Sequence, residues 1–131
     1  MSASLKSVGA ITLFVQDPQR SKAFYERAFD VPSVYEDENS VVFKFENTLI
    51  NLLEQSEAPS LIAPAAVAHA DAGSRMQFSI WVDDANAVCD ALAAREVVLL
   101  NGPIDRPWGM RTACFADPDG HVWEIAQELA G

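Results

Sequence analysis

The same order of expected secondary-structure elements occurs twice along this chain, and this repetition constrains the fold more than any single segment. Each half opens with an alternating, strand-like segment, "GAITLFVQD" and "MQFSIWVDD". Each half closes with a strand-like segment, and "NTLINLLEQ" aligns with "GHVWEIAQE" without a gap. Between them lie a helical pattern and two further short strand candidates. The chain therefore reads β-α-β-β-β, linker, β-α-β-β-β, which indicates an internal duplication.

Capping residues place the two helices. Asp17 followed by Pro18 is typical of a helix start, and we expect a helix over residues 18–29. Asp83 or Asp84 caps the second helix, which we expect within 83–96. Two prolines and many alanines mark residues 55–75 as a linker, with one short helix around 65–70. We predict one domain over 1–131, with a first βαβββ module at 8–54 and a second at 76–127.

Composition excludes several classes of function. Half of the residues are hydrophobic, which favours a folded protein. The formal net charge of -10 disfavours nucleic acid and anionic membranes as partners. The apolar runs are too short to span a bilayer, and the first residues lack the pattern of a signal peptide, so we predict a cytoplasmic protein. We expect Cys89 and Cys114 to be buried, inert thiols.

Three motifs in this order resemble the vicinal-oxygen-chelate superfamily, which includes glyoxalase I, extradiol dioxygenases, and fosfomycin- and bleomycin-resistance proteins. They are "ITLFVQDPQRSKAFYERAF", "PWGMR" at 107–111 and "FADPDGHVWEIAQ" at 115–127. The resemblance implies an α+β fold in which two βαβββ modules form curved mixed sheets around a cup. It also implies a homodimer, in which the cup can contain residues of both subunits.

Members of this superfamily hold a divalent metal at four inward positions, one on the first and one on the last strand of each module. Carried over to this chain, these positions are Ala10, Asn51, Gln77 and Glu124. Ala10 has no donor atom, Asn51 and Gln77 are neutral amides, and only Glu124 is charged. Zn²⁺ typically takes three protein ligands even in an open catalytic site, and related metals rely on imidazole and carboxylate. We therefore predict no bound metal and no cofactor.

Glu124 is open to two interpretations. In a cup it would be a partly buried carboxylate that needs donors, and Gln77 and Asn51 can supply them. It then either belongs to a polar network that fixes the shape of the cup or holds a ligand directly. Arg111, which follows the loop of Trp108, either contacts a ligand anion or forms a salt bridge with one of the many acids, and we favour the salt bridge.

Aromatic residues suggest what the cup binds. Because side chains alternate along a strand, Trp81 should face the cup together with Gln77, and Trp123 should face the core. Trp108 lies in a loop that can close over the cup. The alternative for each tryptophan is ordinary packing. We predict no catalytic residue and a ligand-binding set that consists of Phe14, Phe43, Asn51, Gln77, Trp81, Trp108, Arg111 and Glu124.

Two functions follow from the resemblance. The first is a metal-independent protein that binds a small molecule, such as a drug or a planar aromatic and cationic compound, as in the bleomycin-resistance branch. The second is a metal-dependent lyase, isomerase or dioxygenase related to glyoxalase I, since chemistry in this superfamily depends on a Lewis-acidic metal. The incomplete set of metal ligands and the aromatic side chains that face the cup favour the binding protein over the enzyme.

Overall fold

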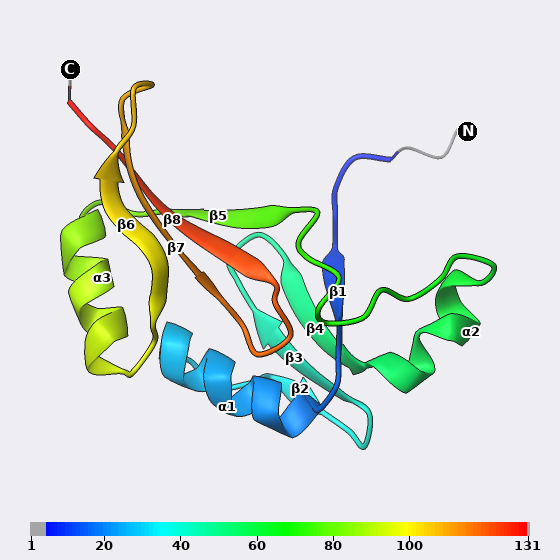
Figure 1. Cartoon of the computed structure of the whole chain (residues 1–131). Helices are drawn as coiled ribbons and strands as arrows, with labels where there is room; N and C mark the ends of the chain where they lie inside the picture. Colours follow the sequence, from blue (N-terminus) through cyan, green and yellow to red (C-terminus); the bar gives the residue numbers. More distant parts are fainter. Residues whose placement is uncertain (1–4, 131) are drawn as a thin grey trace.

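Two four-stranded mixed sheets with the same strand order make up the fold (Figure 1). The structure is a computed structural model that describes residues 5–130. The first sheet has the order β1-β4-β3-β2, formed by β1 (Ala10–Val15), β2 (Tyr35–Glu36), β3 (Ser40–Lys44) and β4 (Leu49–Glu54). The second has the order β5-β8-β7-β6, formed by β5 (Gln77–Trp81), β6 (Leu99–Asp105), β7 (Met110–Ala116) and β8 (Val122–Glu128).

Strand direction repeats between the halves as well. β1 runs parallel to β4, β5 runs parallel to β8, and the other pairings within each sheet are antiparallel. This repetition confirms the predicted α+β fold with two βαβββ halves.

The helices begin where the aspartates predict. In α1 (Pro18–Phe29) the Asp17 carboxylate accepts hydrogen bonds from the backbone amides of Gln19 at 3.0 Å and Arg20 at 3.3 Å. In α3 (Ala85–Ala94) the Asp84 carboxylate accepts one from the amide of Ala87 at 3.0 Å. Both caps satisfy amides that have no partner within the helix.

One hydrophobic core serves both halves. Tyr25 of α1 stacks on Phe29 at 5.6 Å between ring centroids and meets Trp123 of β8 edge-on at 5.8 Å. Phe24 of α1 approaches Phe115 of β7 at 6.0 Å. As Figure 1 shows, α1 lies at the junction beneath the two sheets, so one helix of the first half covers strands of both.

The Asp117–Gly120 turn joins the halves through hydrogen bonds. The Tyr25 hydroxyl donates to Asp117 Oδ2 at 2.6 Å and accepts a bond from the indole Nε1 of Trp123 at 3.0 Å. Asp119 Oδ1 accepts from the backbone amide of Gln16 at 2.9 Å. The sequence Asp-Pro-Asp-Gly is typical of a turn, but it gives no sign that the two carboxylates reach across to the first half.

The linker differs from expectation. Its helical turns come early, in η1 (Gln55–Glu57) and α2 (Pro59–Ile62), and the helix expected around 65–70 is absent there. Proline sets the bounds of α2, because Pro59 starts it and Pro64 forces the preceding Ala63 into an extended conformation, with ψ 140°. None of the helices within residues 5–130 is long and apolar enough to cross a membrane.

Each sheet packs one face on the helices and leaves the other largely open. On β1 the buried side chains are Leu13 and Val15, while Ala10 and Thr12 are exposed. On β5 the residues Gln77, Ser79 and Trp81 are exposed. The open faces carry the positions that the sequence assigns to the cup, and they lie on separate sheets.

Candidate functional site

A groove of about 230 Å³ lies on the open face of the second sheet, around Glu124. We call it the Glu124 groove. It is formed by β5, β7, β8, the Asn101 position of β6 and the loop between β6 and β7. Its lining consists of Gln77, Asn101, Arg106, Trp108, Thr112, Ala113, Cys114 and Glu124.

Strand alternation puts Glu124 in this groove. Its neighbours Trp123 and Ile125 are 2% and 3% exposed and face the core, so Glu124 faces the other way. In the sheet it pairs with Ser79 of β5 on one side and Cys114 of β7 on the other. The central position of β8 thus places one carboxylate in the middle of the face.

Ser79 holds the Glu124 carboxylate. The Ser79 hydroxyl donates to Glu124 Oε1 at 2.7 Å, a short bond of the charge-assisted kind. Gln77 lines the same groove but, within residues 5–130, neither Gln77 nor Asn51 donates to this carboxylate. The second oxygen, Oε2, therefore has no protein donor in the described part of the chain. The expected polar network is thus smaller than the sequence suggests.

The groove also holds one guanidinium. Arg106 Nε donates to the Thr112 hydroxyl at 2.9 Å, which orients the side chain across β7. Arg106 and Glu124 are the charged residues of the lining, so the groove joins one positive and one negative group beside the ring of Trp108. Trp108 is 69% exposed, and its ring surface is accessible to a ligand.

The structure brings together three of the predicted ligand-binding residues and separates the others from them. Gln77, Trp108 and Glu124 line the Glu124 groove. Trp81 lies on the same face of β5 but outside the lining, and its side chain is 69% exposed. Arg111 instead forms a salt bridge in which its Nε donates to Asp105 Oδ1 at 2.6 Å. The same hydrogen bond lowers the pKa of the Asp105 carboxyl.

The predicted residues of the first half lie elsewhere. Phe43 is 1% exposed and packs against Tyr25 at 5.9 Å between centroids, so the core, not a ligand, surrounds it. Asn51 Nδ2 donates to the Thr12 hydroxyl at 3.4 Å, and its buried Oδ1 has no partner among the described residues. Phe14 is half-buried and lines a different hollow, beside the linker.

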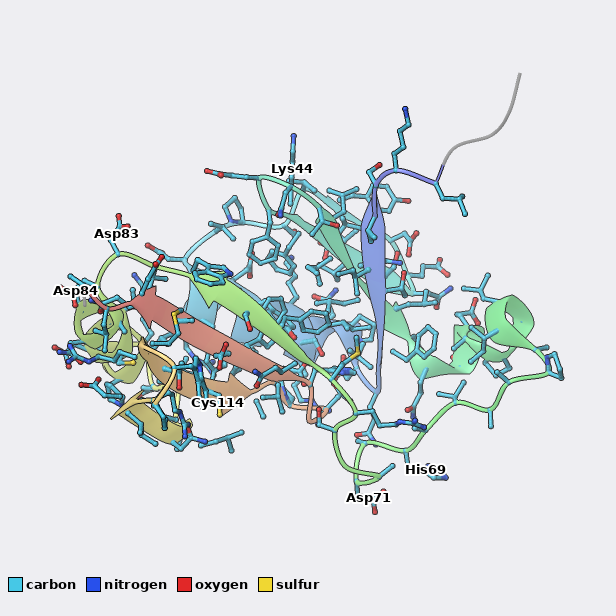
Figure 2. All side chains as sticks on the ribbon, turned by 90° about the horizontal axis from the view of Figure 1, so that it is seen from above. Lys44, His69, Asp71, Asp83, Asp84 and Cys114 are labelled. Atoms are coloured by element: carbon cyan, nitrogen blue, oxygen red, sulfur yellow. The ribbon has the colours of Figure 1, made fainter. Side chains whose placement is uncertain are left out.

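Sequence reasoning missed part of the lining. We expect Cys114 to be buried, but it is half-exposed and pairs with Glu124 across β7 and β8. Figure 2 labels its side chain. The signal was present, because Ala113 and Phe115 on either side are both fully buried and alternation turns Cys114 outward. Asn101, Arg106 and Thr112 have no such signal, since the β6–β7 register is irregular.

The donor set fits a divalent metal poorly. Within residues 5–130, no group of three His, Cys, Asp or Glu side chains comes close enough together to hold an ion. Of the four family positions, Ala10 carries no donor, and Asn51 lies on the first sheet, away from Gln77 and Glu124 on the second. One carboxylate and one amide on the same sheet do not make a metal centre.

Comparison with known proteins identifies the family. A sequence profile of the Glyoxalase/Bleomycin resistance protein/Dioxygenase superfamily matches residues 7–125. The chain therefore belongs to this superfamily, as the motifs of the sequence predict.

Individual relatives are distant in sequence and close in fold. The metallothiol transferase FosB of Lysinibacillus sphaericus is 23% identical over 122 residues, which cover 93% of this chain and 82% of FosB. A crystal structure of a glyoxalase/bleomycin resistance protein/dioxygenase from Nocardioides superposes with a TM-score of 0.87 at 20% identity, covering 99% of this chain and 88% of that one. Lactoylglutathione lyase from Agrobacterium tumefaciens gives a TM-score of 0.73 at 19% identity, covering 95% and 96%. At these identities the structures share the fold, which by itself does not define an activity.

Proposed function

We propose that this protein binds an apolar or aromatic small molecule, including planar cations, without a bound metal and without changing it chemically. The supporting observation is the Glu124 carboxylate, which has Ser79 as its side-chain donor and lies in the same groove as the exposed ring of Trp108. Ring surfaces supply most of the affinity in such pockets through buried area, and a few polar groups fix orientation. Sequestration of a drug or a planar aromatic compound is the corresponding role, and we expect it in the cytoplasm.

We further propose that a second copy of the chain completes the cup. All of the lining of the Glu124 groove comes from the second half, whereas Asn51 lies on the open face of the first. In a homodimer the first-half face of one subunit can lie opposite the second-half face of its partner. Asn51 and Phe14 would then contribute to a cup whose other wall carries Trp81, Trp108 and Glu124.

The charge of Glu124 favours a cationic ligand. A carboxylate with a free oxygen attracts a cation, and stacking on a tryptophan adds about 0.5–2 kcal/mol to cation binding. Arg106 opposes this preference, so its distance from the bound ring decides how strongly cations are favoured over neutral compounds. A neutral ring of the same size should still bind through its area.

Calorimetric titration with three compounds of one ring size tests the proposal: N-methylacridinium, acridine at neutral charge, and acridine carboxylate. We expect the cation to bind best. Trp81→Ala and Trp108→Ala should each weaken binding by about 1 kcal/mol or more. Glu124→Gln should weaken the cation selectively, whereas Glu46→Gln, which removes the same charge from an exposed turn, should not. Preference for the carboxylate, or indifference to both tryptophan substitutions, would show that the assignment is wrong.

A metal-dependent lyase, isomerase or dioxygenase is the second candidate. It is favoured by the buried Asn51 Oδ1, which is an oxygen donor without a partner among the described residues. It is also favoured by the names of the relatives, a metallothiol transferase and a lactoylglutathione lyase. Both candidates use Glu124, so metal affinity separates them.

Thermal unfolding with added Ni²⁺ or Zn²⁺ makes that separation. A ligand that binds only the native state raises the unfolding temperature by mass action. We expect the temperature to stay nearly constant for the wild type and for Glu124→Gln alike. A large rise that Glu124→Gln abolishes would favour the enzyme instead.

A further inference from the structure

A second hollow, of about 260 Å³, lies at the junction of the two halves and away from the Glu124 groove. We propose that this junction hollow is a binding site for a small organic anion. Its volume is below the range of about 300–1,000 Å³ for drug-sized ligands, so the occupant is correspondingly small. The linings of this hollow and of the Glu124 groove share no residue, and Phe14 is the residue of the hollow that the proposed dimeric cup would also use.

Three distant segments build the walls. They are residues 12–14 of β1, residues 68–76 of the linker and the 119–121 turn between β7 and β8. The linker comes close to the turn: a Cβ on Gly120, whose φ is +89°, would lie 3.1 Å from the carbonyl oxygen of Ala70. Glycine at this position permits both the left-handed backbone and the close approach.

Positive and hydrogen-bonding groups gather in the junction hollow, although the molecule as a whole is negatively charged. The chain has a formal net charge of -10 and two histidines, and both histidines, His69 and His121, line the junction hollow together with Arg75. No carboxylate in the described part of the chain lies within salt-bridge distance of Arg75. Asp71 is outside the lining and lies at the outer tip of the loop that carries His69 (Figure 2).

The one acidic residue of the lining, Asp119, already has hydrogen-bond and ion-pair partners within the protein. Asp119 is 6% exposed, and its carboxylate accepts hydrogen bonds from the Gln16 amide at 2.9 Å and the Ser21 hydroxyl at 3.3 Å. Arg20 pairs with the same carboxylate at 3.4 Å. The Arg20–Asp119 pair is neutral overall, so the charge of Arg75 remains for a ligand.

The ring of His121 is held in one orientation. Its Nε2 lies 3.1 Å from the carbonyl oxygen of Phe14. Because a carbonyl oxygen only accepts, Nε2 carries the hydrogen, and Nδ1 is left without a protein partner in residues 5–130. In its protonated form an imidazole offers an anion a second N–H donor and a positive charge.

An apolar wall makes the preferred anion organic. Leu13, the half-buried Phe14 and Met76, which is 57% exposed, line the hollow beside the polar groups. Inorganic phosphate would leave this wall in water, whereas the ring of an aromatic carboxylate would cover it. Benzoate combines the charge, the apolar part and the small size.

Titration of the histidine imidazole resonances with benzoate in the full-length protein tests this site. We expect the resonances of both His69 and His121 to shift in a saturable way, because both side chains line the hollow. Arg75→Gln should weaken benzoate by about tenfold or more, since it removes a charge-assisted bond. Arg27→Gln removes the same charge from an exposed position of α1 outside the lining and should leave the affinity unchanged.

Several results of this titration would contradict the proposed site. Absence of any imidazole shift with benzoate, or equal weakening by Arg27→Gln and Arg75→Gln, would overturn the site. Inorganic phosphate or benzylammonium binding as tightly as benzoate would overturn its assignment to an organic anion.

Discussion

The hydroxyl group of Tyr25 connects the two halves at the scale of single residues. It donates to Asp117 and accepts from Trp123, and its residue is 1% exposed. Burial, followed by the charge of Asp117, raises the pKa of Tyr25 far above its usual value. The phenol therefore stays protonated and remains the donor that a buried carboxylate requires.

Removing that hydroxyl should destabilise the protein disproportionately. Tyr25→Phe leaves the Asp117 carboxylate and the Trp123 indole each short of a partner, which costs about 1–3 kcal/mol of unfolding free energy. Tyr35→Phe is the matched control, because Tyr35 is 56% exposed and its hydroxyl bonds to the exposed Asp37. Urea denaturation of the two variants measures the difference, and equal losses would contradict the role given to Tyr25.

The β6–β7 hairpin shapes the Glu124 groove at the scale of elements. Its irregular register places Asn101, Arg106 and Trp108 around the groove. The irregularity passes through Gly102, whose φ is +94° and whose missing Cβ would collide with the backbone of Thr112 and Ala113. A glycine is needed here for both its backbone conformation and its size.

Substitution of this glycine should cost more than substitution of another in the same hairpin. Gly109 has a similar φ of +86°, but nothing lies within 4 Å of a Cβ placed there. Gly109→Ala should therefore cost only the backbone strain of about 1–2 kcal/mol, and Gly102→Ala should cost more, since β6 must also move away from β7. Thermal or urea unfolding ranks the two, and equal losses would show that β6 yields without strain.

At the scale of the whole molecule, the open faces of the two sheets lie on different parts of the chain and carry exposed side chains such as Thr12 and Trp81. The core, by contrast, is continuous through both halves. Exposed tryptophan on an open sheet face is typical of a surface that meets a partner. Because each chain carries two similar halves with open sheet faces, we expect this partner to be a second copy of the chain.

We predict that sedimentation at micromolar concentration gives twice the 14.3 kDa mass of one chain. Ala10→Arg places a charge on the exposed first-half face and should shift the protein toward monomer. Ala93→Arg makes the same change on an exposed position of α3, outside the open faces, and should not. A monomeric wild type, or dissociation by Ala93→Arg alone, would contradict this arrangement.

Much of the fold could be predicted from the sequence, because its signals are local and repeated. Asp17 and Asp84 mark helix starts, and alternation puts Trp123 in the core and Glu124 on the open face. The alanine-rich linker misled the helix prediction: its alanines at 65–70 form no helix, and the helical turns lie earlier, where Pro59 starts α2 and Pro64 limits it.

The candidate site could be predicted less well, because its members come together through register and tertiary contacts. Parity could not assign Phe43, which proved to belong to the core. The irregular β6 hid Asn101, and the partner of Glu124 is Ser79 instead of the expected amides. No local pattern relates His69 to His121, which only the path of the linker brings to one hollow.

The contacts between the halves change the meaning of the duplication. Two tandem copies of a sequence can form two separate domains, each of which folds without the other. Here Tyr25 of the first copy fills space beside Trp123 of the second, and the turn of the second copy binds α1 of the first. A fragment ending in the linker would expose Phe24, Tyr25 and Phe29 to water and would leave Asp117 without its donor. We therefore predict that the two halves unfold together as one cooperative unit, although the sequence shows them as a repeat.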